Sequence, residues 1–218
     1  MKLIYCFFIS NLMFISSFAQ SFTQSKTVEV NHFIFPEFTQ GVLLMKSGEE
    51  LITLLNYNSS TEEMIYVDNE KKLAISVESL ANIDTIFIQN KKFVVVGTKF
   101  FEFINNPKFD LYIEHKCKVN APGQTTAYDG ISHSAAVKSY SSIDMSTELK
   151  LPAGYEIQPY NYYRIMKNGI SQKFINMRQL EKIYFNKKDL FKTYVEQNDI
   201  AFNNEENIIR LIKYLESN

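Results

Sequence analysis

The chain has 218 residues, of which 45% are hydrophobic and 22% are charged, with 23 basic residues against 24 acidic ones. These are ordinary globular values, and they exclude disorder, collagen and coiled coil as descriptions of the whole chain. A formal charge of −1 leaves no surplus of Lys and Arg to displace counterions from a phosphate backbone, so we expect no nucleic-acid partner.

Residues 1–19 have the order of segments found in a secretory signal peptide. Lys2 supplies a short positive start, and residues 3–15 form an apolar run. Small residues then occupy the −3 and −1 positions of a cleavage site before Gln20. We predict cleavage between Ala19 and Gln20, with export to the periplasm or the cell exterior. An uncleaved N-terminal anchor is the alternative.

Cleavage would change the cysteine content of the chain. Cys6 lies in the removed segment, so Cys117 would be the only thiol and no internal disulfide could form. The exported domain of about 200 residues would depend on its hydrophobic core alone, which a domain of this size can supply. No later stretch reaches the length of a membrane span, so we expect no transmembrane segment after cleavage.

Residues 28–119 have the pattern of antiparallel β-structure. Short runs of β-branched and aromatic residues are separated by turn residues about every eight to twelve positions. Residues 100–104 fit either a short strand or one helical turn. The clearest alternation is at 111–119, where one face of a half-buried strand would carry Leu111, Ile113, His115, Cys117 and Val119.

Apolar periodicity is lost over residues 120–150, which are rich in Gly, Ser, Thr and Ala. We therefore predict a long polar loop there. Loops of about thirty residues are usually functional or disordered. Strand signals return at 162–166 and 170–175. The intervening Asn168-Gly169 predicts a type I′ hairpin turn, which requires two positive φ angles.

The C-terminal segment has helical periodicity. Apolar residues between Leu190 and Val195 predict one helix, with Asn186 or Asp189 as its cap. The stripe from Ile208 to Leu215 predicts a second helix, capped by Asn203 or Asn204, with two glutamates in its first turn.

Together these signals predict an α+β fold that is mainly antiparallel β, arranged as a roll, sandwich or open barrel, with two C-terminal helices. The β-rich domain would cover residues 20–175, including the loop at 120–150. Residues 176–218 would form a helical segment packed on that domain.

Residues 186–192, 194–203 and 205–214 resemble the ending of a family of uncharacterised exported Gram-negative bacterial proteins. The turn at 56–58 and the loop at 128–132 are similar to segments of the same family. The resemblance implies an exported protein in which a β-rich domain precedes a short helical pair. It transfers no catalytic residue.

A zinc site is one candidate chemistry. His115 and Cys117 have a spacing that can chelate zinc from one side of a strand, and Asp129 and His133 on the following loop would complete the site. The alternative is that His115 and Cys117 are buried strand residues. We favour the alternative, because no second pair of Cys or His supports a metal site, and we predict neither a metal nor a cofactor.

The sequence also contains two candidate catalytic nucleophiles, a serine in residues 130–134 and Cys117, but the context of each argues against that role. Residues 130–134 begin like a Gly-x-Ser-x-Gly elbow but end in Ser134, without the strand-to-helix context that such an elbow needs. Cys117 on a buried strand face would have a raised pKa. We therefore predict a non-enzymatic binding or assembly role. A hydrolase acting on envelope glycans or peptides is the alternative, and an accessory subunit of an envelope complex is the second.

Tyrosines supply the best indication of a binding surface. A tyrosine ring offers flat apolar area with a polar tip, which suits a surface glycan or another envelope protein. The alternative is that these are half-buried strand residues. The candidates lie within and just after the long loop: Tyr128, Tyr140, Tyr155, Tyr160, Tyr162 and Tyr163.

Overall fold

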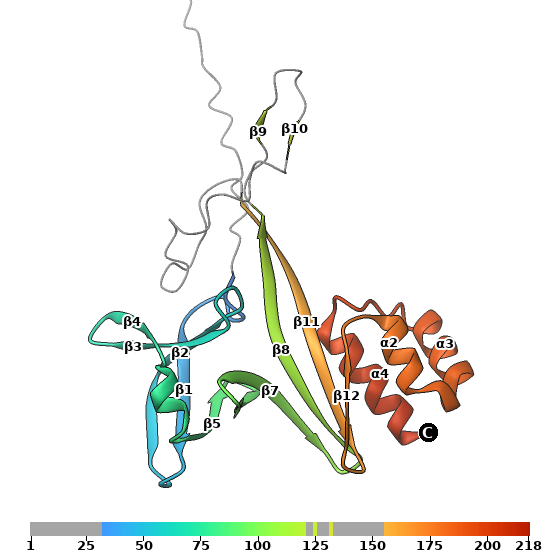
Figure 1. The fold of residues 1–218 in the computed structure, drawn as a ribbon, viewed down its shortest axis with the longest axis horizontal. Coiled ribbons are helices and arrows are strands. Elements are labelled where there is room, and N and C mark those ends of the chain that lie inside the picture. The colour runs from blue at the N-terminus through green and yellow to red at the C-terminus, as the bar shows by residue number, and fades with distance from the viewer. Residues whose placement is uncertain (1–31, 121–123, 126–130, 133–154) are drawn as a thin grey trace, which may run out of the picture.

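A computed structural model describes residues 32–120, 124–125, 131–132 and 155–218 (Figure 1). These residues form an α+β fold with one ten-stranded antiparallel sheet that does not close on itself, followed by C-terminal helices. The predicted fold class is therefore confirmed.

The large sheet runs in the order β12-β11-β8-β7-β6-β5-β1-β2-β3-β4. Because β5 pairs with β1 and not with β4, the chain crosses back after its first four strands. Two further short strands, β9 and β10, pair with each other inside the segment that was predicted to be a loop. The strands are β1 (Thr39–Met45), β2 (Glu50–Asn58), β3 (Glu63–Asp68), β4 (Lys71–Ala74), β5 (Ile83–Ile88), β6 (Lys91–Val96), β7 (Lys99–Asn106), β8 (Phe109–Asn120), β9 (Gln124–Thr125), β10 (Ile131–Ser132), β11 (Glu156–Lys167) and β12 (Ile170–Phe174).

The structure tests three local predictions on the strands. The turn between β11 and β12 has positive φ angles at Asn168 (50°) and Gly169 (76°), as a type I′ turn requires. Residues 100–104 belong to strand β7 and not to a helical turn. On β8 the predicted inner face is buried, except that Cys117 is partly exposed.

The sheet curls so strongly that the end of β2 reaches β8. The β7–β8 register covers only Phe109–Ile113 of β8. Farther along β8, the Cys117 N–H donates to the carbonyl of Ser59 at 3.0 Å, and the Tyr57 hydroxyl donates to the carbonyl of His115 at 3.4 Å. Four strands separate β2 from β8 in the sheet order, so these contacts fix the curvature.

The C-terminal segment contains three α-helices where the sequence predicted two. The extra helix, α2, begins after Asn176, whose side chain accepts from the Gln179 N–H. Asn204 caps α4 as predicted, by accepting from the Asn207 N–H. Neither predicted cap serves α3, which has no side-chain cap. The helices are α1 (Val77–Leu80), α2 (Met177–Ile183), the 3₁₀ helix η3 (Phe185–Lys187), α3 (Lys188–Gln197) and α4 (Glu205–Ser217).

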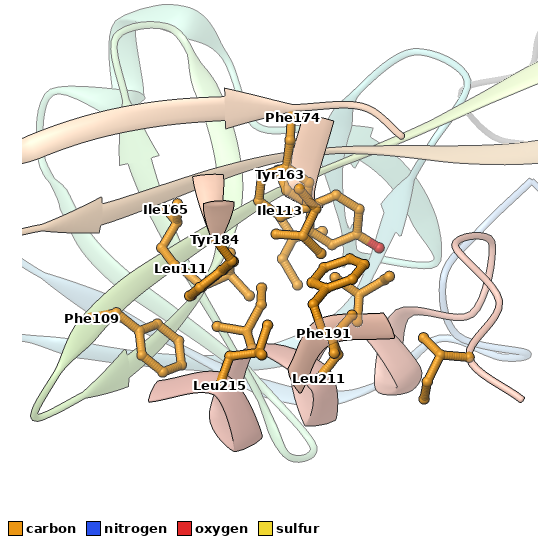
Figure 2. Close-up of a cluster of buried hydrophobic side chains, with 14 residues drawn as sticks. Phe109, Leu111, Ile113, Tyr163, Ile165, Phe174, Tyr184, Phe191, Leu211 and Leu215 are labelled. Carbon is orange, nitrogen blue, oxygen red and sulfur yellow. The ribbon is translucent and has the colours of Figure 1, made fainter. Parts of the chain in front are cut away.

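Two hydrophobic cores hold these elements together. One fills the curled half of the sheet and includes the fully buried Leu55, Ile86 and Phe93. The other lies between the helices and strands β8, β11 and β12, where Leu211 and Leu215 of α4 face Leu111 and Ile113 (Figure 2). Each such side chain stabilises the fold by roughly 1.5–3 kcal/mol. Within the described residues, no helix is both long and apolar enough to cross a membrane.

Candidate functional site

Strands β8 and β11 place the described tyrosines. Their register aligns Tyr160 with Lys116, Tyr162 with Glu114 and Tyr163 with Ile113. Because side chains alternate along a strand, Tyr160 and Tyr162 share one face and Tyr163 lies on the other. Tyr163 therefore points to the helices, and the other two tyrosines point away from them.

The structure brings together some of the predicted tyrosines and separates others. The rings of Tyr160 and Tyr162 are 5.6 Å apart and edge to face. Tyr163 is buried and stacks on Phe174, and burial raises the pKa of its hydroxyl. Tyr155 is partly buried just before β11. Tyr128 and Tyr140 lie outside the described residues.

A small pocket lies beside this strand. Its volume is about 110 Å³, and its walls come from β11 and the connection between α3 and α4. Residues 159–163 form one wall, and Phe202 and Asn203 form part of the other. All three tyrosines from 160 to 163 thus border a concave surface.

We call the helix-free side of strands β6, β7, β8, β11 and β12 the outer face. Four cations of this face lie over aromatic rings, at 5.1–5.8 Å from the ring centroids, as in cation–π contacts. Sequence reasoning missed this pairing, because each ring and its cation come from different strands. The pairs are Lys92 with Phe103, Lys116 with Tyr162, Lys118 with Tyr160, and Arg164 with Phe101.

A salt-bridge network borders the outer face. Lys99 donates to Glu62 at 2.5 Å and to Glu114 at 2.7 Å, and Lys116 also contacts both carboxylates. These hydrogen bonds, first the one that Lys99 donates to Glu114, raise the pKa of Lys99 above its ordinary value. The network holds Glu62, in the segment after β2, against strands β7 and β8. The positive charges of the two lysines offset the negative charges of the two glutamates.

A second charged cluster, centred on the buried side chains of Glu102 and His115, lies between the two cores. Lys91 Nζ lies 2.6 Å from Glu102 Oε2 and 2.6 Å from Glu205 Oε1, so it bridges β7 and the first turn of α4. His115 Nε2 is 2.7 Å from the same Glu102 oxygen, and its Nδ1 is 3.5 Å from Glu205 Oε2. Asn161 of β11 donates to Glu205 at 3.2 Å. We call these five residues the buried cluster.

The electrostatics of the buried cluster follow from its geometry. Burial alone would raise the pKa of Glu102, but the hydrogen bond from His115 and the charge of Lys91 outweigh it and hold that pKa below its ordinary value. Burial would likewise lower the pKa of Lys91, and the charges of Glu102 and Glu205 outweigh it and raise that pKa. The side chains of Lys91 and Glu102 are only 20% and 6% exposed, so water screens the pair weakly.

Of the four weak zinc candidates, only His115 and Cys117 are among the described residues, and they do not fall into one group of potential ligands. His115 lies with Glu102 and Glu205, whose ligand atoms are within 4.8 Å of one another. Cys117 belongs to no such group among the described residues, and burial raises the pKa of its thiol, as predicted. Asp129 and His133 lie outside the described residues.

A divalent metal at the buried cluster would have to displace Lys91. The Lys91 ammonium is already bound to both carboxylates that a metal would use. His115 faces those two carboxylates with different ring nitrogens, whereas a single metal ion takes only one nitrogen from each imidazole. The arrangement is that of a buried ion-pair network that fastens α4 to the sheet.

Sequence reasoning missed the buried cluster, although one signal was present. Glu102 interrupts the apolar run at 100–104, and a carboxylate in a buried strand needs a partner. Its partners Lys91 and His115 come from the two strands that flank β7.

An apolar groove of about 590 Å³ lies at the other end of the molecule, between β1–β3 and α1. Leu51 and Ile52, neighbours on β2, both line it, together with Tyr66 and Ile83. Ile52 remains 62% exposed, which is unusual for an isoleucine in a strand. The sequence signal was the run at 51–55, in which four of the five residues are apolar and both faces of the strand carry apolar side chains.

Comparison of the chain with protein-family models, with curated proteins and with solved structures gave no match.

Proposed function

We propose that the protein is exported and acts by binding or assembly, without catalysis, in the periplasm or at the cell surface. The observation that carries this proposal is the outer face. There, tyrosines and cations gather on the side of the sheet that the helices leave uncovered, so the folding of the core does not account for them.

The chemistry of the other polar groups favours binding over hydrolysis. The charged groups of the buried cluster are held in mutual salt bridges, so none is free to act as a general acid or base. The raised pKa of Cys117 keeps its thiol protonated and unreactive.

Export rests on the signal-peptide pattern of residues 1–19. Mass analysis of the protein recovered from outside the cytoplasm should show a chain that begins at Gln20. An intact Met1 there would contradict cleavage.

Affinity capture tests the binding surface. The processed chain would be used to capture partners from envelope extracts of its own organism, in parallel with a Tyr160→Ala/Tyr162→Ala variant. The control is Phe185→Ala, which removes an aromatic side chain that is 71% exposed on η3. We expect the double tyrosine variant to lose a partner that the control retains. If all three proteins capture the same partners, the proposal is contradicted.

The apolar groove supports a second candidate, an accessory subunit of an envelope complex. Beside the groove, β4 is the last strand in the order of the described sheet, and the edge of a sheet is a position at which another chain can add a strand. Ile52→Asp would place a charge in the groove, and we expect it to abolish association with a protein partner. Unchanged sedimentation of the complex would contradict this candidate.

A further inference from the structure

The outer face carries cations that the fold does not neutralise. Glu114 is occupied by Lys99 and Lys116, as described above. Four other cations of the face have no carboxylate partner among the described residues: Lys92, Lys118, Arg164 and Lys173. The chain as a whole has a formal charge of −1, so this concentration of positive charge is local.

Two of these cations occupy an unfavourable arrangement. Arg164 of β11 and Lys173 of β12 are direct cross-strand partners. Side chains in such positions have Cβ atoms about 4.5–5.5 Å apart, and like charges there destabilise the sheet. In addition, Nε of Arg164 is buried and has no hydrogen-bond partner in the described part of the chain. Buried donors are almost always satisfied in native proteins, so an unsatisfied one requires an explanation.

A recess opens between the same two cations. Its volume is about 40 Å³, and Arg164, Lys173, Tyr162, Phe101 and Glu114 are among the residues that line it. Since one water-sized group needs roughly 10–15 Å³, the recess has room for the two oxygens of a carboxylate. An anion there would lie against both Arg164 and Lys173 and would offset the repulsion between their like charges.

We infer that the outer face binds an acidic polysaccharide, with a sugar carboxylate in the recess between Arg164 and Lys173. The inference rests on the proposed function and names its ligand class. The planar guanidinium of Arg164 matches a carboxylate in shape. The hydrogen bonds that Arg164 and Lys173 would donate to this carboxylate would both be charge-assisted. The rings of Tyr160 and Tyr162 lie edge to face, and their edges and hydroxyls are placed to meet the adjoining sugar units. Lys118, over the ring of Tyr160, is placed to meet a further carboxylate along the chain.

The same geometry argues against a single-stranded nucleic acid. Proteins bind such strands by stacking bases on free aromatic faces. Here Lys116 and Lys118 lie over the faces of Tyr162 and Tyr160, and Arg164 lies over Phe101. A cation therefore lies over one face of each of these rings, which suits carboxylates and sugar hydroxyls better than stacked bases.

A binding assay with polygalacturonate tests the inference, and its fully methyl-esterified form is the matched uncharged ligand. We expect the protein to bind the carboxylate form, and to lose affinity as salt is added. Arg164→Gln and Lys173→Gln should each weaken binding by about tenfold or more, the loss expected when a charge-assisted hydrogen bond is removed. Lys192→Gln, which neutralises an exposed lysine on α3, should bind like the wild type.

A melting curve separates loss of binding from loss of folding. Because Lys173→Gln removes one of two like charges, this variant should melt at or above the wild-type temperature although its binding is weakened. A clear fall in melting temperature would overturn the like-charge argument.

Three other results would overturn the inference. They are equal binding of the charged and esterified polysaccharides, unchanged binding by Arg164→Gln, and tighter binding of single-stranded DNA or of phosphatidylglycerol vesicles than of polygalacturonate. If any of these results appears while the Tyr160→Ala/Tyr162→Ala variant still loses its captured partner, the ligand class is wrong and the proposed function stands. If that capture is also unchanged, both fail.

Discussion

Replacement of Lys91 by methionine is the sharpest test of the buried cluster. Methionine keeps most of the apolar stem and removes the ammonium that bridges Glu102 and Glu205 at 2.6 Å on each side. Among the described residues, the buried carboxylate of Glu102 and the partly buried carboxylate of Glu205 would then keep only His115 and Asn161 as partners.

The expected cost follows from burial and charge. Removing one partner of a buried ion pair costs about 3–5 kcal/mol, because the other charge is left desolvated. Since the side chain of Lys91 is 20% exposed, water can reach the vacated space, and we expect a loss near the lower end, about 3 kcal/mol. Lys92→Met is the matched control on the outer face, and it should cost no more than about 1 kcal/mol, the strength of its contact with Phe103.

The pH dependence identifies the cause of the loss. In the wild type the folded pKa of Glu102 lies below its unfolded value, so its stabilisation is present above that unfolded value and is lost as the pH falls through the folded pKa. Without Lys91, burial dominates and protonation of Glu102 relieves the unpaired charge. The difference between wild type and Lys91→Met should therefore be largest near pH 7 and shrink as the pH approaches about 4.3, the ordinary pKa of a glutamate.

Urea unfolding followed by circular dichroism at pH 7 and pH 5 measures this difference. A loss below about 1 kcal/mol at pH 7 would mean that the pair is solvated, as surface ion pairs are. A loss of the same size at both pH values would mean that methionine disturbs the packing and not the charge balance. Either result would refute the electrostatic argument.

Three further predictions concern packing and reactivity. Gly41→Ala should lower the free energy of unfolding by about 1–3 kcal/mol, because a Cβ there would lie 2.6 Å from the carbonyl oxygen of Phe87; an unchanged urea midpoint would contradict this. Leu211→Ala, in the core beneath α4, should cost about 2–5 kcal/mol in thermal unfolding, whereas the exposed Ile170→Ala should change stability by less than about 0.5 kcal/mol. The thiol of Cys117 should react slowly with a disulfide reagent at pH 7 and quickly after unfolding, because burial raises its pKa; fast reaction of the folded protein would count against this.

The features that sequence predicted correctly depend on neighbouring residues. Alternation on β8, the Asn168-Gly169 turn and the stripe of α4 each need only a few adjacent positions, and each is present. The extra helix α2 was missed because it spans only 7 residues, too few to establish a helical period. Sheet order was also out of reach, because the pairing of β5 with β1 depends on packing between residues distant in sequence.

Strand parity alone is enough to divide the tyrosines between the two faces of the sheet. Tyr163 and the apolar Ile165 are two positions apart, so their side chains lie on the same face of the strand. Tyr162 and Arg164 likewise share the other face. The two groups must therefore face opposite sides, and only the group with the cation fits a wet surface. What parity cannot supply is the neighbouring strand: the alignment of Arg164 with Lys173 depends on the hairpin register, which the type I′ turn fixes.

The buried cluster explains why the two halves of the protein should unfold together. Glu205 looked from sequence like an ordinary acidic residue in the first turn of a helix, where it favours the helix dipole. In the structure the same carboxylate binds Lys91 on β6, and Lys91 in turn binds Glu102 on β7. Lys91 thus connects the core beneath the helices to the strands whose core fills the curled half of the sheet. Its partner Glu205 lies 114 residues away in the sequence. If that link is as strong as its burial implies, Lys91→Met should separate a single unfolding transition into two, with the helices lost first.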